Sequence, residues 1–202
     1  MAKLYFRFGT MGSAKTLNLL AVAHNYESQS KPVFLIKPQI DNRFGESIVK
    51  SRAGLHREAD LIVNDETDLL VALPNNTACV LVDEAQFLSA PLVEQLRKVA
   101  TYKDVPVICY GLRTNFKSKL FEGSQRLLEL ADSVEEIKTT CAFCHKKAIM
   151  NLQIASTAPV SDGVEIGAED KYRPACFRCY LQRSKHFLSA SETFALASNT
   201  TD

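Results

Sequence analysis

The sequence lacks an excess of charge of either sign, and it lacks a long hydrophobic run. Lys and Arg number 24 against 23 Asp and Glu, which leaves a formal net charge of +1. A net charge this small gives no bulk field toward nucleic acid or an anionic membrane, so we expect neither as a partner. No apolar stretch reaches the roughly 18 residues of a transmembrane helix. The start Met-Ala-Lys before a strand is unlike a signal peptide. These absences predict a cytoplasmic protein.

Internal repeats and low-complexity linkers are also missing, and 46% of the 202 residues are apolar. A chain of this length and composition buries a sizeable core and is not disordered. We therefore expect one main domain with a small appendage. The six cysteines are expected to be reduced in a cytoplasmic compartment, where paired spacing indicates a metal site before a disulfide.

A segment rich in small residues separates an apolar run from a helical pattern near the start of the chain. The run Leu4–Phe8 has the aromatic content of a buried strand, and the apolar residues after position 16 suit a packed helix. The segment fits the phosphate-loop pattern G-x-x-x-x-G-K-S/T at all positions but one. Its residues are Gly9, Thr10, Met11, Gly12, Ser13, Ala14, Lys15 and Thr16.

This loop is predicted to bind phosphate through backbone N–H groups and the positive end of a helix dipole. The ammonium of Lys15 reaches the outer phosphates, and the hydroxyl of Thr16 ligates a magnesium ion. Ala14 departs from the pattern, which has glycine there, and a positive φ at this position would cost about 1 kcal/mol or more. The alternative is a Gly-Ser turn that only joins a strand to a helix.

The rest of the main domain alternates between strands and helices. A strand, helix, strand order implies parallel pairing, with ligands beyond the carboxyl ends of the strands. We therefore expect an α/β fold with a mostly parallel sheet flanked by helices. Further strands are predicted at Val33–Ile36, Cys79–Val82, Val105–Tyr110 and Ser133–Ile137, and helices over residues 89–100 and 117–130. Residues 39–60 are expected to form a polar excursion with a short helix, or else a solvated loop.

Two carboxylates directly follow the predicted strand Cys79–Val82. A buried strand there delivers Asp83 and Glu84 to the edge of the sheet where the phosphate loop also lies. Asp83 is placed to hold magnesium through water, and Glu84 to act as a base. The alternative is an acidic pair at the surface end of a strand.

Four of the cysteines form two Cys-x-x-Cys pairs with 31 residues between them: Cys141, Cys144, Cys176 and Cys179. Each pair puts two sulfurs on one side of a tight turn, and two pairs complete a tetrahedron, so we expect a closed, structural zinc site. Two redox dithiols or unrelated cysteines are the alternatives. His145 adjoins the first pair and is the alternative ligand.

The segment between the two cysteine pairs is too polar to form its own core. Zinc would pin both of its ends, which suits a lid over a small ligand, and Tyr172 is the aromatic residue best placed to face that ligand. Residues 1–138 are expected to form the nucleotide-binding domain, residues 139–183 the zinc-binding domain, and residues 184–202 a disordered tail.

Taken in order, these motifs resemble the type II thymidine kinases over nearly the whole chain. The phosphate loop alone is too common to indicate this family, and the specific feature is the ordered set. It comprises Gly9–Thr16, Ile40–Phe44, Ser51–Gly54, Asp83–Phe87, Tyr110–Phe116, Leu120–Phe121 and a zinc-anchored lasso with Ile166, Gly167 and Tyr172. The resemblance implies a RecA-like P-loop fold. It also implies an enzyme that transfers the γ-phosphoryl of ATP to the 5′-hydroxyl of thymidine or deoxyuridine, giving dTMP in pyrimidine deoxynucleotide salvage.

The resemblance further implies a role for each matching residue. Glu84 becomes the catalytic base, and Thr16 and Asp83 hold Mg²⁺. The implied ATP site joins the phosphate loop to Asp41, Arg43, Asp83, Glu84, Ala85 and Gln86. The implied thymidine site comprises Phe87, Leu112, Phe116, Phe121, Gly163, Val164, Glu165, Ile166, Gly167 and Tyr172. The family is typically a homotetramer with structural zinc, and it is inhibited by dTTP.

Three other functions compete with this one. A P-loop ATPase with a zinc ribbon that works on nucleic acid would need a basic, aromatic-lined groove, and the near-neutral charge speaks against it. A nucleotide-binding regulator without turnover is favoured only by Ala14. A zinc-stapled interaction module leaves the motifs at Gly9 and Asp83 unused. Ala168, where the family often has glycine, is the second departure from the family pattern.

Overall fold

Six parallel strands form the central sheet of the computed structural model, which describes residues 1–43, 45–154 and 171–184. From edge to edge the strand order is β5, β2, β6, β7, β1 and β8. The strands are β1 (Leu4–Phe8), β2 (Val33–Pro38), β5 (Leu61–Val63), β6 (Cys79–Val82), β7 (Val107–Gly111) and β8 (Ser133–Glu136). The predicted parallel α/β fold is therefore confirmed.

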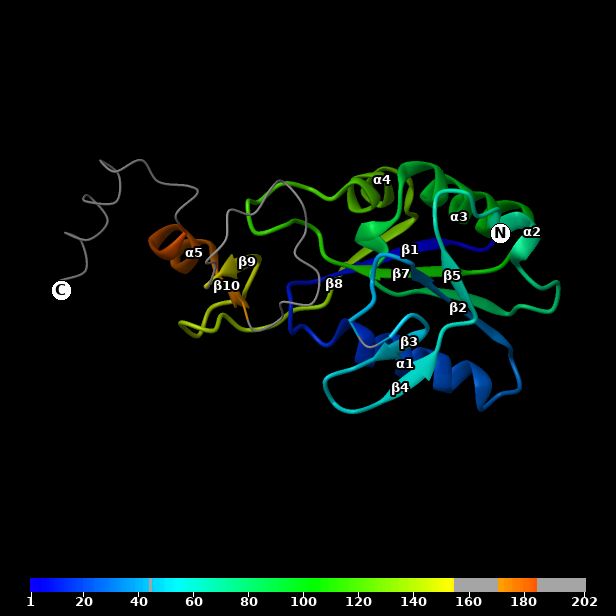
Figure 1. The fold of residues 1–202 in the computed structure, drawn as a ribbon, viewed down its shortest axis with the longest axis horizontal. Coiled ribbons are helices and arrows are strands. Elements are labelled where there is room, and N and C mark those ends of the chain that lie inside the picture. Colours follow the sequence, from blue (N-terminus) through cyan, green and yellow to red (C-terminus); the bar gives the residue numbers. More distant parts are fainter. Residues whose placement is uncertain (44, 155–170, 185–202) are drawn as a thin grey trace.

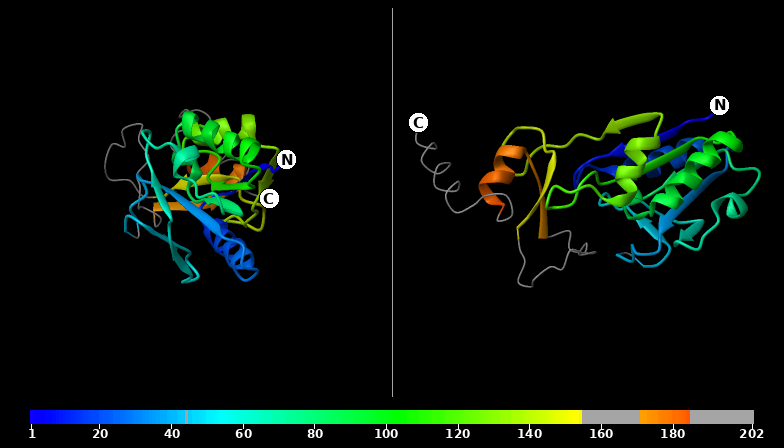
Figure 2. Two further views of the ribbon diagram at one scale, coloured as in Figure 1. Left: turned by 90° about the vertical axis from the view of Figure 1, so that its right-hand side faces the viewer. Right: turned by 90° about the horizontal axis from the view of Figure 1, so that it is seen from above.

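Helices cover both faces of this sheet. Figure 1 shows α1 on one face and α3 and α4 on the other, and the turned views of Figure 2 show the same layers. Within the described part of the chain, no helix combines the length and apolar character needed to cross a membrane. The helices of this main unit are α1 (Lys15–Glu27), α2 (Leu69–Ala72), the 3-10 helix η1 (Ala85–Phe87), α3 (Ala90–Tyr102) and α4 (Glu122–Leu130).

Side chains of β1 alternate between two cores. Leu4 and Phe6 are fully buried with the side chains of α3, whereas Tyr5 between them packs on the face covered by α1. This alternation follows from the two-residue period of a strand, and burial on both faces is typical of a parallel sheet between helices. β1 also pairs with β7 and β8, so the loop that follows it is held from both sides.

The short helix predicted within residues 39–60 is wrong for the described part of that segment. Two strands, β3 (Ile48–Lys50) and β4 (His56–Glu58), pair there in antiparallel fashion. Gly54 takes a left-handed φ of +91° in the turn between them. Val49 is 2% exposed and packs with the side chains of α1, so a tertiary contact decides the conformation.

The helix predicted over residues 117–130 begins later than expected, at Glu122. A turn occupies the earlier positions: Ser118 has a left-handed φ of 64°, and the Asn115 side chain accepts a hydrogen bond from the Lys119 N–H at 3.0 Å. An asparagine side chain that binds nearby backbone in this way competes with helix formation. The other strand predictions are confirmed to within two residues, and β5 was not predicted.

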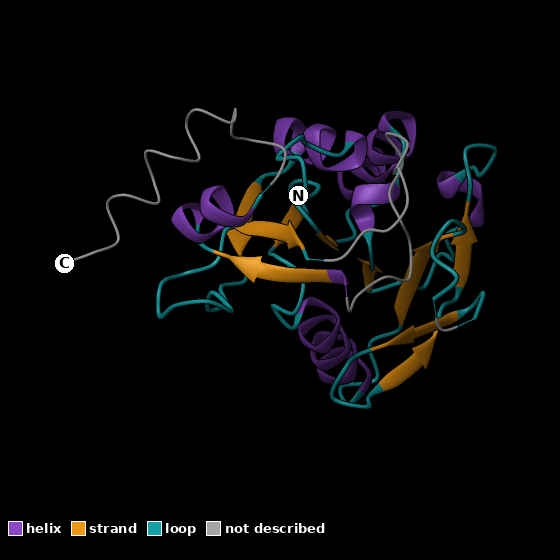
Figure 3. Ribbon diagram, turned by 60° about the vertical axis from the view of Figure 1, so that its left-hand side comes forward, coloured by secondary structure: helices purple, strands orange, loops and turns teal. Residues whose placement is uncertain are grey.

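A second, smaller unit lies beyond the end of β1 (Figure 1), and Figure 3 shows its strands and its helix beside the main sheet. It consists of the antiparallel strands β9 (Met150–Gln153) and β10 (Tyr172–Ala175) and the helix α5 (Phe177–Arg183). This unit has its own group of buried side chains, which includes cysteines of both predicted pairs. The smaller unit lies at the carboxyl end of β1, where the predicted phosphate loop begins.

Candidate active site

The predicted phosphate loop connects β1 to α1. The Gly9 N–H donates to the carbonyl of Gly111 on the neighbouring strand β7 at 3.2 Å, which ties the start of the loop to the sheet. A β-carbon on Gly9 would lie 2.3 Å from the Ser13 hydroxyl oxygen and 2.6 Å from a backbone carbonyl, so only glycine fits. α1 begins at Lys15, and the positive end of its dipole therefore faces the loop.

Ala14 has the left-handed backbone that the glycine of the usual pattern would adopt. Its φ and ψ are 63° and 28°, and Gly12 two residues earlier is also left-handed with a φ of +75°. An alanine in this region costs about 1 kcal/mol or more relative to an unstrained conformation. The loop therefore keeps its shape at Ala14 in spite of the β-carbon.

Lys15 and Thr16 bring a cation and a hydroxyl to the end of β6. The Lys15 ammonium donates to the carbonyl oxygens of Gly9 and Thr10 at 3.3 and 2.9 Å. The Thr16 hydroxyl lies 3.3 and 3.4 Å from the two carboxylate oxygens of Asp83. The two oxygen groups predicted to serve a magnesium ion are thus neighbours, and Mg²⁺ prefers oxygen ligands.

Asp83 is buried, and other carboxylates lie close to it. Burial raises the pKa of its carboxyl to about 7; the charge of Glu84 adds to the rise, and that of Arg43 opposes it. A bound divalent cation is often the largest local charge in such a site and reverses this balance. The acidic donor set around Asp83 therefore fits Mg²⁺.

An arginine joins two carboxylates above the sheet. Arg43 makes a bidentate contact with Asp41, with nitrogen–oxygen distances of 2.6 and 3.2 Å, and it also donates to Glu84. Burial disfavours the charge of Arg43, but Glu84 and Asp41 outweigh that effect and hold its pKa above the ordinary value. Asp41, Arg43 and Glu84 thus form one connected row of charged side chains.

Glu84 itself has a left-handed backbone, with φ 49° and ψ 39°, at the junction of β6 and η1. Strained conformations of this kind persist where the surroundings determine them, and they cluster at functional sites. One carboxylate oxygen of Glu84 accepts from Arg43 and the other from the side-chain amide of Gln86. Gln86 is 2% exposed, and its carbonyl oxygen accepts from the Leu112 N–H at 3.0 Å. The Glu84 carboxylate is therefore oriented by fixed partners.

Part of the phosphate loop, Arg43 and Glu84 line one cleft of about 250 Å³. Its walls come from residues 11–17 of the phosphate loop and α1, from Arg43 and Glu84, from residues 50–53 of the hairpin turn, and from Leu112. Lys50 and Arg52 add two cations to this cleft that the sequence analysis did not assign to the site. A carboxylate, a set of phosphate-binding groups and an apolar side chain therefore face the same space.

The aromatic residues of the implied thymidine site meet in two pairs. The ring centroids of Phe116 and Tyr172 are 5.9 Å apart, and Tyr172 reaches Phe116 from the smaller unit. Phe87 and Phe121 form an edge-to-face pair with centroids 5.8 Å apart. Gly163, Val164, Glu165, Ile166 and Gly167, also predicted here, lie outside the described residues.

Lys37 is a buried cation that the sequence analysis passed over. It is 0% exposed, and its ammonium donates to the carbonyls of Gly45 and Ile48 at 2.9 and 3.0 Å. The same ammonium lies 3.7 Å from the Asp41 carboxylate. A lysine inside an otherwise apolar strand is a sequence signal, because buried lysines are rare unless paired. Lys37 holds the segment that carries Asp41 and Arg43.

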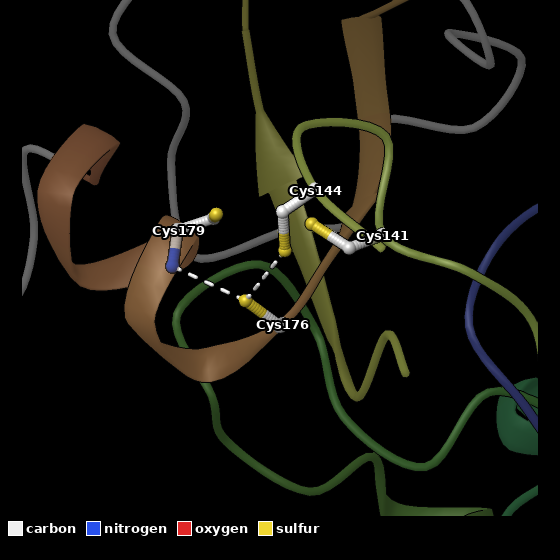
Figure 4. Close-up of side chains that lie close together, drawn as sticks. All are labelled: Cys141, Cys144, Cys176 and Cys179. Atoms are coloured by element: carbon white, nitrogen blue, oxygen red, sulfur yellow. Dashed lines mark hydrogen bonds between the residues drawn. The ribbon is translucent and has the colours of Figure 1, made fainter. Parts of the chain in front are cut away.

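The four paired cysteines converge between the loop before β9 and the start of α5 (Figure 4). Their sulfur atoms all lie within 4.8 Å of one another, and those of Cys144 and Cys176 are 3.6 Å apart. Thiolates bound tetrahedrally to zinc at about 2.3 Å would be about 3.8 Å apart. The cluster is therefore consistent with a structural zinc site.

The pKa values of two of these thiols are shifted in opposite directions. Burial works against ionisation of Cys141, but backbone hydrogen bonds lower the pKa of this thiol to about 6. Burial and hydrogen bonds with the neighbouring thiols raise the pKa of Cys179 to about 12. Four neighbouring thiolates repel one another, and a Zn²⁺ ion, which binds thiolates, would stabilise all four in this charged form. Four sulfur ligands would leave no position for water on such an ion, as in structural zinc sites.

Comparison with known proteins shows one family. The thymidine kinase family matches residues 2–180. A thymidine kinase of Streptococcus pyogenes serotype M3 is 46% identical over 184 residues, which cover 89% of this chain and 97% of that protein. A thymidine kinase of Streptococcus gordonii is 45% identical over 187 residues, which cover 90% of this chain and 97% of that protein. Among solved structures, the Pif1 helicase from Candida albicans matches 67% of this chain and 36% of that chain with a TM-score of 0.40 and 10% identity, a likeness too weak to carry an argument.

Proposed function

The chain belongs to the thymidine kinase family, and on this premise we propose which of its residues perform the kinase reaction. It is a thymidine kinase, EC 2.7.1.21, with ATP and thymidine as substrates. The reaction joins the 5′-oxygen of thymidine to the γ-phosphorus of ATP and breaks the bond from that phosphorus to the bridging oxygen, which leaves with ADP. One proton leaves the 5′-hydroxyl. The protein's part is to position the two substrates, neutralise charge and accept that proton.

The phosphate loop is proposed to bind the triphosphate of ATP. Backbone N–H groups of the loop would surround the phosphates, apart from those of Gly9, Met11 and Ser13, which donate to oxygen atoms of the protein. The Lys15 ammonium would exchange its contacts with the Gly9 and Thr10 carbonyls for phosphate oxygens. Thr16 and Asp83 would hold Mg²⁺, which supplies charge neutralisation on the triphosphate when bound. The ATP site further includes Ala85 and Gln86 at its edge.

Glu84 is proposed to accept the proton of the 5′-hydroxyl. Its carboxylate is held by Arg43 and Gln86, so it has a defined orientation before substrate arrives. Arg43, positioned by Asp41, is proposed to lie against the transferring phosphoryl group and to stabilise its charge. Glu84 would then act on the 5′-hydroxyl of thymidine, and Arg43 on the phosphoryl group that this hydroxyl receives.

The thymine base is proposed to lie in an apolar slot next to Glu84. Gln86 connects Glu84 to the Leu112 backbone, which supports a slot next to the Glu84 carboxylate. Phe87 and Phe121 form one aromatic pair of this slot, and Phe116 and Tyr172 form another. Main chain of residues 163–167 is proposed to close over thymine, by resemblance to the family.

A single observation carries these assignments: the phosphate loop, Arg43, Glu84 and Leu112 line one cleft. A phosphoryl donor and a nucleoside acceptor can meet only where both sites open into the same space. Separate clefts for the loop and the carboxylate would have excluded direct transfer between them.

Two substitutions test the two halves of this site. Lys15→Ala should weaken ATP binding about 10- to 100-fold, since a hydrogen bond to a charged group contributes about 1.5–3 kcal/mol, while thymidine binding stays within about threefold. Phe116→Ala should weaken thymidine binding and leave ATP binding nearly unchanged. Isothermal titration calorimetry of each ligand alone measures both values. Equal ATP affinity in Lys15→Ala and the unsubstituted enzyme would contradict the phosphate-loop assignment.

The left-handed backbone at Ala14 gives a further test of the loop. Ala14→Gly removes the strain and should leave KM for ATP within about fivefold of the original value, since 1 kcal/mol corresponds to about that factor. Ala14→Val should raise KM for ATP more than about tenfold, because a β-branched residue at positive φ is an outlier. Steady-state kinetics with varied ATP measure both effects. Ala21→Val, the same change at an exposed position of α1, serves as the control. An unchanged KM in Ala14→Val would show that the left-handed angle is not needed.

We propose the same domain division as the sequence predicted: a kinase domain over residues 1–138 and a zinc-binding lasso domain over residues 139–183. The tail over residues 184–202 lies, apart from its first residue, outside the described residues. Family resemblance supports a cytoplasmic homotetramer that is inhibited by dTTP, accepts deoxyuridine as well as thymidine, and supplies dTMP in salvage.

A further inference from the structure

We infer that Asn151 of β9 is a positioning residue that fixes the shape of the phosphate loop from the zinc-binding unit. Its side-chain oxygen accepts a hydrogen bond from the Met11 N–H at 2.8 Å, across 140 positions of sequence. Its side-chain nitrogen donates to the Thr114 carbonyl at 3.1 Å. Asn151 is 4% exposed, so neither bond competes freely with water. The inference rests on the proposed phosphate-binding role of the loop.

Strand alternation explains why Asn151 faces the loop. Its neighbours Met150 and Leu152 point into the core of the smaller unit, where they pack with the cysteines. A residue between them on a strand projects from the opposite face. β9 is itself held by β10, with Met150 paired to Ala175 and the Ile149 N–H donating to the Ala175 carbonyl at 2.9 Å. The zinc-side core thus sets the position of Asn151.

The chemistry of the bridge requires a carboxamide. Met11 lies in the middle of the loop and offers an N–H, whereas Thr114 lies after β7 and offers a carbonyl. Only a side chain with one acceptor and one donor at this spacing satisfies both groups. Leucine has the same shape and neither group, and aspartate has no donor when ionised. Losing the bridge frees the Met11 peptide to rotate, and the left-handed positions Gly12 and Ala14 follow it directly in the chain.

A different side chain connects the same unit to the thymidine side. The Tyr180 hydroxyl donates to the Phe116 carbonyl at 2.5 Å and lies 3.2 Å from the Ser118 hydroxyl. Tyr180 is fully buried and belongs to the same core as Met150 and Leu152. Asn151 thus contacts the phosphate loop as well as Thr114, whereas Tyr180 contacts Phe116 and Ser118 on the thymidine side. The bond to the phosphate loop can therefore be removed without those of Tyr180.

Matched substitutions separate the two contacts. Asn151→Leu and Tyr180→Phe each remove buried polar atoms from the zinc-binding unit and keep most of its shape. The full-length, zinc-loaded variants are compared by zinc content, by calorimetric Kd for ATP and for thymidine, and by KM and kcat. We expect Asn151→Leu to raise Kd and KM for ATP about tenfold and to change Kd for thymidine less than about threefold. Tyr180→Phe should raise Kd for thymidine by a larger factor than Kd for ATP.

Equal changes for both substrates in Asn151→Leu, or no change in either, would overturn the inference, because a merely structural role does not single out ATP. If Asn151→Leu does not bind one zinc per chain, Asn151→Ala enters the same comparison. Lys15→Ala is measured in parallel. Normal ATP binding in Lys15→Ala would refute the phosphate-loop assignment itself, whereas weak binding in Lys15→Ala with normal binding in Asn151→Leu would refute only the role of Asn151.

Discussion

Replacing Glu84 by glutamine should lower kcat about 10²- to 10⁴-fold while thymidine binding changes less than about threefold, because a positioned general base contributes that factor to rate. The amide has the size of the carboxylate and keeps an oxygen for Arg43, but it does not accept the proton of the 5′-hydroxyl. Rapid-quench single-turnover kinetics measure the chemical step directly.

Asp41→Asn is the matched control for this substitution. It also removes a carboxylate partner of Arg43 and lies at a buried position, but it leaves the proposed base in place. We expect Asp41→Asn to lower kcat less than Glu84→Gln does. A parallel loss of kcat and thymidine affinity in Glu84→Gln would indicate that Glu84 only binds the nucleoside. Its ion pair with Arg43 would then be the reason for the position of the Glu84 carboxylate.

Removal of zinc should abolish the thymidine site while leaving the main sheet folded. The core of the smaller unit holds few apolar side chains beyond its cysteines, and units of this kind are generally unfolded without their metal. Cys176→Ser should lower kcat/KM for thymidine at least about 100-fold, which corresponds to about 2.7 kcal/mol. The loss follows because Tyr172 and Tyr180 reach the slot from this unit. Zinc analysis, thermal unfolding and kinetics on one preparation measure all three quantities.

Cys109→Ala provides the control for cysteine loss. Cys109 is fully buried in β7, and burial raises the pKa of its thiol above the ordinary value, so it is no candidate ligand. Cys109→Ala should keep one zinc per chain and its activity. Full thymidine kinetics in zinc-free Cys176→Ser protein would contradict the proposed link between the metal and the nucleoside slot.

Local patterns were enough to predict the parallel sheet and the order of its motifs. The apolar strands that precede Gly9 and Asp83 can be recognised from neighbouring residues alone, because strand, loop and helix follow one another directly in sequence. The same holds for the cysteine pairs, whose spacing reflects the geometry of a tetrahedral site. Gly9 and Asp83 do follow strands directly, and the four cysteines do converge.

The parts that the sequence did not reveal depend on contacts between distant segments. Val49 decides the conformation of its hairpin by packing against α1, and no local propensity encodes that burial. Asn151 reads as an ordinary polar residue until the fold brings it to Met11. Lys37 is the exception, since a lysine in an apolar strand is visible in sequence as a buried charge that needs partners.

Coupled ADP release by purified, zinc-loaded protein with Mg²⁺ and ATP tests the central claim most directly: one cleft serves both a nucleoside and a triphosphate. The assay compares thymidine, deoxyuridine, deoxycytidine, single-stranded DNA and no acceptor, with Lys15→Ala as the reference of weakened ATP binding. We predict that thymidine, and deoxyuridine to some degree, stimulates ADP release with one dTMP formed per ADP, and that deoxycytidine and DNA do not. Stimulation by single-stranded DNA alone, or ADP release that ignores the acceptor, would contradict the account.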